Sequence, residues 1–165
     1  MISMNSPALM IRKNDIEQLL DEWSHVTPWV RSHLSAKHPP HRYEGDLLIE
    51  DQCLVFRGRD IKEGQAFEEV IPLDSIIEVA IGFDERLKGS TDFSFGNGGP
   101  VPFTVCYQSE AGEQTAYFTT YLNHYPIHII NGNRKWYETL KNITRRTARR
   151  ELKAEKAPAL VTAGV

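Results

Sequence analysis

The side chains best suited to hold a metal ion are histidines, of which the chain has six. His38 and His41 have a ligand-like gap filled by two prolines. His124 and His128 are four residues apart, but Pro126 between them argues against a shared helical face. Neither pair is accompanied in sequence by the carboxylates or thiols that complete a zinc site. We therefore expect loop histidines without a metal, and no cofactor.

Two cysteines, Cys53 and Cys106, are the strongest nucleophiles in the sequence. Both lie in apolar runs, which predicts buried core thiols in neighbouring strands rather than a disulfide. The chain has no Gly-x-Ser-x-Gly motif, and its glycine-rich stretch at 96–100 lacks the Lys-Ser/Thr pair of a phosphate-binding loop. These features predict that the protein is not an enzyme. A small-ligand carrier or enzyme with a pocket near the 84–100 loop is the second of two alternatives.

Charged residues are divided unevenly along the chain, whose formal net charge is −3. Residues 134–156 contain nine Lys or Arg against three Glu, and the remainder contains ten Lys or Arg against nineteen Asp or Glu. Two pairs of arginines spaced by four share one face of a predicted helix, namely Arg145, Arg146, Arg149 and Arg150.

This arginine face has two interpretations. It is a solvated helix end, whose cations favour the C-terminal dipole, or it binds anionic lipid, nucleic acid or an acidic protein. The acidic remainder would repel the phosphates of nucleic acid, and it could itself be the partner in a neighbouring subunit. No secretory signal and no apolar run of about 20 residues is visible, so we expect a cytoplasmic protein.

The elements that must position these residues are mainly strands. Alternating apolar residues and turn signals predict six strands, and Phe93–Phe95 is a candidate for a short seventh. The six predicted runs are 42–50, 53–59, 66–73, 75–82, 101–108 and 114–121. The first two are joined by a turn at residues 50–52.

Helices are predicted at both ends of the chain. Asn14 caps a helix with Glu17 three residues on, and a second short helix begins at Thr27-Pro28. Trp23 and Trp29 in this segment either dock on the sheet or form a subunit contact. A longer amphipathic helix is predicted from about residue 134 to 155, with four residues on one face, namely Trp136, Leu140, Ile143 and Thr147.

The segment Glu69–Val79, in which an apolar-Pro-apolar-Asp sequence leads into a strand, resembles GRAM-type and bacterial PH-like domains. Seven short strands closed by one C-terminal helix is the arrangement of that pleckstrin-homology-like superfold, and the resemblance implies that the Trp136 helix plugs the barrel. Phosphoinositide-binding members carry basic residues around the first hairpin. Here that turn is acidic, Glu50-Asp51-Gln52, with only Arg57 and Arg59 beyond it, so the usual phosphoinositide pocket is not expected.

Taken together, these patterns predict an α+β, mainly β protein with three parts. Residues 1–41 form an N-terminal helical extension, residues 42–156 form a PH-like barrel or roll with its C-terminal helix, and residues 157–165 form a flexible tail. We expect a non-enzymatic binding or assembly module for protein interaction or self-association. The alternative is a peripheral membrane module that binds anionic lipid through the basic helix.

Overall fold

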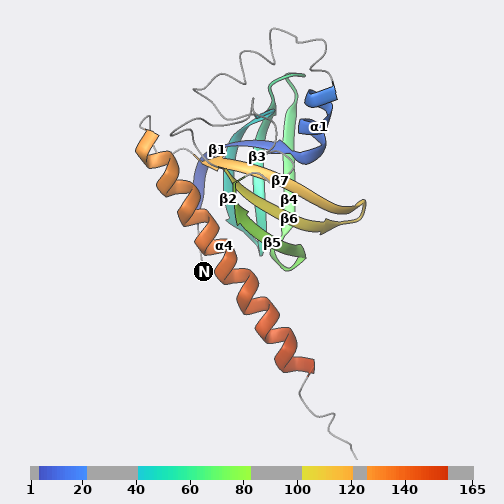
Figure 1. The fold of residues 1–165 in the computed structure, drawn as a ribbon, viewed down its shortest axis with the longest axis vertical. Helices are drawn as coiled ribbons and strands as arrows, with labels where there is room; N and C mark the ends of the chain where they lie inside the picture. Colours follow the sequence, from blue (N-terminus) through green and yellow to red (C-terminus); the bar gives the residue numbers. More distant parts are fainter. Residues whose placement is uncertain (1–3, 22–40, 83–101, 121–125, 156–165) are drawn as a thin grey trace, which may run out of the picture.

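A computed structural model describes residues 4–21, 41–82, 102–120 and 126–155. Seven strands form one antiparallel sheet in the order β4-β3-β2-β1-β7-β6-β5, which curls into a half-barrel (Figure 1). The strands are β1 (Asn5–Arg12), β2 (Tyr43–Glu50), β3 (Cys53–Asp60), β4 (Ala66–Pro72), β5 (Ile76–Ile81), β6 (Phe103–Ser109) and β7 (Gly112–Thr120). Helix α1 (Lys13–Asp21) follows β1, the 3-10 helix η2 (Leu73–Ser75) joins β4 to β5, and α4 (Pro126–Glu155) follows β7.

The predicted α+β, mainly β class is confirmed, and all six predicted runs form strands within one or two residues of their expected bounds. The turn between β2 and β3 is explained by its backbone. Asp51 and Gln52 both have positive φ, 47° and 62°. A two-residue hairpin turn of this kind matches the twist of the flanking strands. Phe93–Phe95 lies outside the described residues.

Strand β1 was not predicted, and it corrects the assignment of residues 1–41 to a helical extension. It pairs with β2 on one side and with β7 on the other, so it lies at the centre of the sheet. Ala8 and Met10 belong to the inner core, while Leu9 and Ile11 are buried on the opposite face. A strand buried on both faces appears in sequence as a continuous apolar run, which periodicity cannot assign.

Helix α1 packs against β1 and β7 and begins one residue before the predicted cap. The side chain that caps it is Asp15, whose Oδ2 accepts a hydrogen bond from the Arg12 backbone N–H at 3.1 Å. Asn14, the predicted cap, is instead an exposed residue in the first turn. Asp15 therefore supplies the half of a capping box that reaches back from the third helical position.

Close backbone approach between β2 and β3 depends on two glycines that face each other. Gly45 pairs with Gly58. A Cβ atom at Gly58 would overlap the carbonyl oxygen of Glu44, and one at Gly45 would overlap that of Arg57. Glycine in a strand often marks such an approach, and it lets the sheet bend here.

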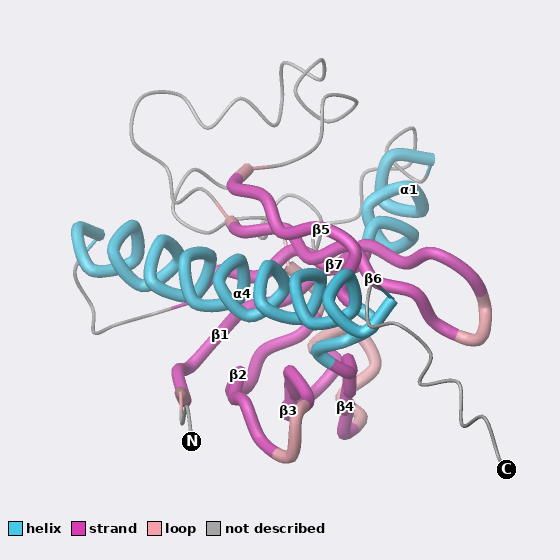
Figure 2. The backbone as a smooth tube through the Cα atoms, turned by 90° about the horizontal axis from the view of Figure 1, so that it is seen from below, coloured by secondary structure: helices cyan, strands magenta, loops and turns pink. Residues whose placement is uncertain are grey.

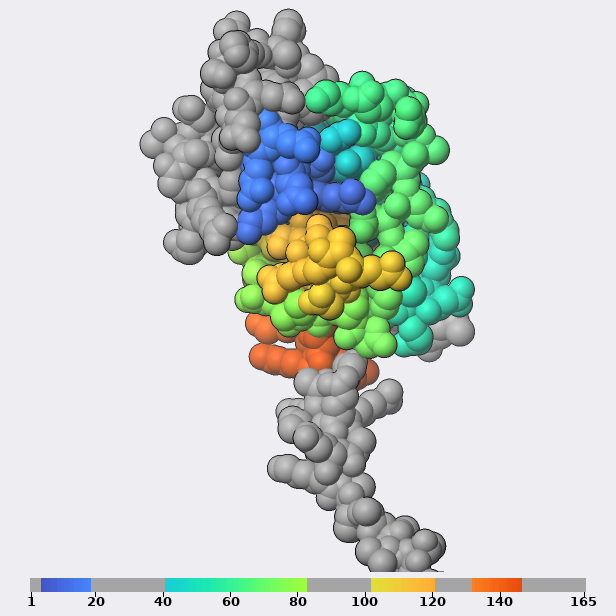
Figure 3. Space-filling view, turned by 90° about the vertical axis from the view of Figure 1, so that its right-hand side faces the viewer, coloured from blue at the N-terminus to red at the C-terminus, as the bar shows by residue number. Residues whose placement is uncertain are grey.

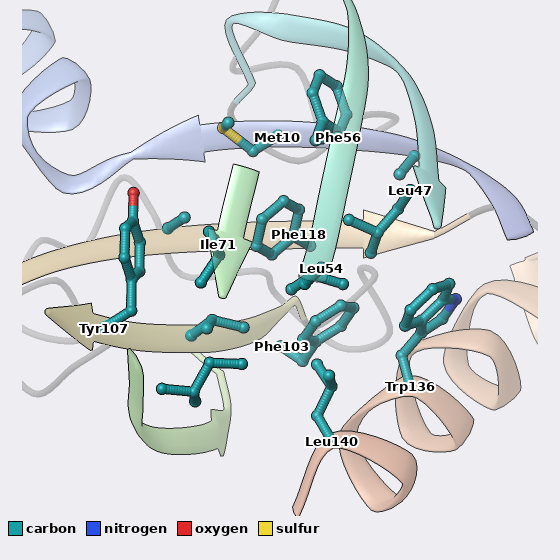
Figure 4. Close-up of a cluster of buried hydrophobic side chains, with 14 of the residues drawn as sticks. Met10, Leu47, Leu54, Phe56, Ile71, Phe103, Tyr107, Phe118, Trp136 and Leu140 are labelled. Atoms are coloured by element: carbon teal, nitrogen blue, oxygen red, sulfur yellow. The ribbon is translucent and has the colours of Figure 1, made fainter. Parts of the chain in front are cut away.

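The inner, concave face of the sheet holds the main core, to which every strand contributes (Figure 4). Phe118 of β7 lies between Phe56 of β3 and Phe103 of β6, with ring centroids 6.3 and 5.4 Å away. Helix α4 lies across the strands, as Figure 2 shows from below, and adds Trp136 and Leu140 to this core. The curl of the sheet thus wraps one apolar core that α4 covers.

Helix α4 has 30 residues and begins earlier than predicted, at Pro126 rather than near residue 134. Proline is favourable at the first helical position because its missing N–H has no partner there in any case. At 1.5 Å per residue the helix is about 45 Å long. None of the described helices is both long and apolar enough to cross a membrane.

Candidate interaction surfaces

The middle of α4 is held on the sheet by two buried contacts. The Trp136 ring is parallel to that of Phe103, with centroids 6.3 Å apart, and its Nε1–H donates to Ser6 Oγ of β1 at 3.1 Å. Asn133 Oδ1 accepts hydrogen bonds from the Thr120 backbone N–H at 2.7 Å and from its hydroxyl at 3.0 Å. Both polar pairs are buried, so separating the helix from the sheet would leave unsatisfied groups as well as an apolar gap.

Beyond this contact region, α4 continues past the end of the sheet (Figure 1). Ile143 is the last described residue that packs against the core. Arg145 and Arg146 follow, and both are exposed. Arg149 and Arg150 lie one turn further along the same helix, where side chains are outside the described part of the structure. The basic end defined as residues 145–153 is thus placed beyond the sheet by a helix that is firmly attached further back.

One edge strand, β4, and the β7-β6-β5 side of the sheet lack cationic residues. Residues 66–82 and 102–120, which form β4 to β7, contain six carboxylates and no Lys or Arg. Glu69 points into the core region, and Glu68 pairs with Arg57 of β3 at 2.5 Å. Glu78, Glu110 and Glu113 are exposed, and among the described residues no ion pair involves any of them.

Two of these carboxylates flank Cys106 on the outer, convex face of the sheet. Glu78 is the cross-strand partner of Cys106, and Glu113 Oε1 lies 3.2 Å from its Sγ. Burial, reinforced by both carboxylates, raises the pKa of the Cys106 thiol. We define the acidic face as Glu78 and Glu113, which flank Cys106, together with the exposed Glu110 in the turn between β6 and β7. Figure 3 shows the β6–β7 hairpin of this face (yellow) at the surface, between the blue N-terminal segment and green residues of β4 and β5.

The prediction that Cys53 and Cys106 are buried core thiols on neighbouring strands is therefore wrong. Cys53 and Cys106 are both free and only partly buried, and neither belongs to the core cluster. They lie on β3 and β6, which β2, β1 and β7 separate in the sheet. A partly exposed thiol whose pKa is raised is mostly protonated at neutral pH and is a weak nucleophile.

Large apolar side chains are exposed on both edge strands. Val70 on β4 is 50% exposed, and Ile77 and Ile81 on β5 are 56% and 49% exposed. A bulge between Ile76 and Glu78 leaves Ile77 without a cross-strand partner. Bulges twist an edge and disturb its ladder, so β5 is a poor template for the addition of a flat strand.

The β2–β3 hairpin, which the sequence predicted as the first of the sheet, is the second because β1 precedes it, and its arginines are paired. Arg57 forms ion pairs with Glu50 and Glu68, and Arg59 lies 3.7 Å from Glu44. Each arginine is therefore matched by a carboxylate on a neighbouring strand. This arrangement supplies no surplus of positive charge for a phosphate group.

A polar cluster inside the curled sheet joins strands that are not neighbours. Glu69 of β4 forms an ion pair with Arg12 of β1 and accepts a hydrogen bond of 2.6 Å from the Tyr107 hydroxyl of β6. The Arg12 guanidinium also lies 4.8 Å from the centre of the Phe67 ring. Next to this cluster, Arg42 forms ion pairs with Asp15 and Asp60 at 2.9 and 2.7 Å. All these charges are matched, so we assign the cluster to structure.

Of the predicted site residues, only part of the arginine face can be placed. Arg145 and Arg146 are together on one exposed stretch of α4. Trp23, Trp29 and the 84–100 loop lie outside the described residues, and so do His38 and His124. The acidic face was not predicted, although its signal was available in the sequence: two long segments without a single cation.

The chain matched no family model and no curated protein in the comparisons made with known proteins. In the described parts of the chain, no group of three or more histidine, cysteine, aspartate or glutamate side chains is arranged to hold a metal ion. Any functional assignment therefore depends on the surfaces described above.

Proposed function

We propose that this protein is a non-enzymatic assembly module of PH-like fold, which works by associating with a protein partner, and first of all with another copy of itself. The observation that carries the proposal is the path of α4. Its middle is buried against the sheet through Trp136 and Leu140, and its basic end continues into solvent beyond the sheet. A polar helical extension of about three turns gains little stability from its own propensity.

The strand order supports the PH-like part of the proposal. β1 to β4 form one meander, β5 to β7 form another, and β1 pairs with β7 to join them. The C-terminal helix covers the curled sheet, as expected for a PH-like barrel and its plug. Helix α1 between β1 and β2 is an addition to that arrangement.

The test is the mass of the purified full-length chain in solution, measured by light scattering after size exclusion at low salt and at about 0.5 M salt. We expect a mass of two or more chains at low salt and a shift toward one chain at high salt, because exposed charges are screened over a few ångströms there. A single-chain mass under every condition would contradict self-association.

A peripheral membrane role is the second candidate, and one observation favours it. Arg145 and Arg146 are exposed, and no described carboxylate pairs with them. Juxtaposed arginines of this kind bind anionic lipid with about 1 kcal/mol per residue near the surface. Co-sedimentation with vesicles containing phosphatidylserine, at low salt and at about 0.15 M, tests this role. Pelleting by the wild type that is lost when the four arginines are reversed would establish it.

A further inference from the structure

We propose that the basic end of α4 from one copy docks on the acidic face of a second copy, on the outer side of β5, β6 and β7. The inference rests on the proposed self-association and names the two surfaces that make it. One surface is residues 145–153 of α4, and the other is the acidic face around Cys106.

The helix of a given copy is on the wrong side of the sheet to reach its own acidic face. Trp136 and Leu140 attach α4 to the inner core. Glu78 is paired with Cys106 on the alternate, outer face, since its neighbour Val79 packs toward the core. A continuous helix cannot bend around the edge of the sheet without a break. The attraction between the two surfaces can therefore be satisfied only between molecules.

The charges of the two surfaces are complementary and are not cancelled within the chain. Residues 145–153 contain five Lys or Arg and one Glu, whereas 76–82 and 102–120, which form β5 to β7, contain three Glu and no Lys or Arg. Glu78, Glu110 and Glu113 have no described ion pair, and the same is true of Arg145 and Arg146. Complementary surfaces of this type increase the rate of association and determine which partner binds.

The dimensions of the two surfaces also agree. Glu78 and Glu113 are on strands separated by one other strand, which places them about 10 Å apart across the sheet. From Arg145 to Arg150 the helix rises about 8 Å. Ile77, which is 56% exposed beside Glu78, offers an apolar surface for the aliphatic parts of the arginine side chains.

The experiment uses two charge-reversed variants of the full-length chain. The helix variant carries R145E, R146E, R149E and R150E, so that both of its surfaces are negative. The face variant carries E78K, E110K and E113K, so that both of its surfaces are positive. Each should give the mass of one chain at low salt, where the wild type associates. When the two are mixed in equal amounts, opposite surfaces meet again, and we expect the wild-type mass to return.

Matched controls separate this contact from the effect of net charge. Reversal of Arg59, Lys62, Arg134 and Lys135 changes the net charge by the same amount as the helix variant, at exposed sites away from the basic end. Reversal of Glu17, Asp46 and Glu63, which are also exposed, changes the net charge by the same amount as the face variant. Both controls should associate like the wild type. Circular dichroism checks folding, and if the face variant is unfolded, glutamine at Glu78, Glu110 and Glu113 replaces it.

The outcomes are distinguishable. Loss in both variants and recovery in the mixture support the proposal. If either variant associates as well as the wild type, self-association stands, but the proposed contact between these two surfaces is overturned. Failure of the mixture to recover, with both variants folded, would also overturn them. A monomeric wild type would overturn self-association itself, and vesicle binding lost only in the helix variant would assign the arginines to lipid.

Discussion

At the scale of single residues, Glu69 joins parts of the sheet that its hydrogen-bond ladder leaves apart. β4 and β5 are the two edges of the sheet and do not pair with each other. Glu69 on β4 reaches Tyr107 on β6 and Arg12 on β1. Its side chain is 13% exposed and that of Arg12 is 37% exposed. This carboxylate therefore helps to keep the half-barrel curled.

Replacement of Glu69 by glutamine tests that role. Gln keeps an acceptor for Tyr107 but leaves the Arg12 guanidinium without its counter-charge. We expect the free energy of unfolding to fall by about 1–2 kcal/mol, less than for a fully buried pair because Arg12 is partly solvated. Urea denaturation followed by tryptophan fluorescence measures it. Glu68→Gln on the outer face is the control, with an expected change below about 0.5 kcal/mol. Equal losses in both variants would contradict the role of Glu69.

Alkaline pH should destabilise the protein through Tyr43. Burial, together with the nearby Asp15 carboxylate, raises the pKa of Tyr43 to about 12, whereas an unfolded tyrosine titrates near 10. Between these values the unfolded chain has released a proton that the folded chain retains. The contribution of Tyr43 to the free energy of unfolding is therefore complete below pH about 10 and is lost as pH rises toward 12.

Tyr43→Phe should weaken this dependence. Urea unfolding at several pH values across the window gives the slope of stability against pH for each protein. The slope of the variant should be shallower but not zero, because burial and the Glu69 carboxylate also raise the pKa of Tyr107. The same slope in both proteins would show that Tyr43 does not contribute.

At the scale of elements, α4 depends on Trp136 for its position. Trp136 is 1% exposed, stacks on Phe103 and donates a hydrogen bond to Ser6 of the central strand. One side chain thus connects the last helix to both the second half of the sheet and β1.

Trp136→Ala should lower the free energy of unfolding by about 3–5 kcal/mol, the usual cost of deleting a large buried aromatic side chain. Thermal and urea denaturation measure the loss. Lys135→Ala changes the preceding exposed residue and should cost less than about 0.5 kcal/mol. A loss below about 1 kcal/mol for Trp136→Ala would be incompatible with the helix as a cover for the core.

At the scale of the whole molecule, stability and interaction occupy different parts of α4. Ile143 is the last residue with a described side chain that contacts the core, and the basic end begins two residues later. The arrangement separates a folded half-barrel from a surface that is available to a partner. Changes at the end of the helix should therefore affect association and leave the fold unaltered.

A chain that ends after Thr144 tests this separation. We expect the free energy of unfolding to change by less than about 1 kcal/mol, because the lost turns contribute mainly marginal helix propensity. Association at low salt should disappear. A second chain ending after Glu138 removes Leu140 and Ile143 as well, and it should be strongly destabilised. An unfolded product from the first truncation would contradict the separation.

The sequence by itself determined the mainly β class, six of the strands and the amphipathic last helix. These elements show short-range signals: alternation of apolar residues, turn residues at 50–52, and the spacing of Trp136 and Leu140. The exposed positions of Arg145 and Arg146 also follow from the end of the apolar stripe at Ile143. All of this information is local along the chain.

Only the tertiary structure decided which strands are neighbours and which distant side chains lie close together. β1 is a central strand because it pairs with β2 and with β7, and its two faces are buried by the inner core and by the side on which α1 packs. An apolar run such as 8–11 does not reveal these neighbours by itself. The Glu69 cluster and the acidic face around Cys106 join residues that are far apart in the chain, through strand order and register. Pairing of distant strands depends on the packing of the whole sheet, and local sequence preferences do not specify it.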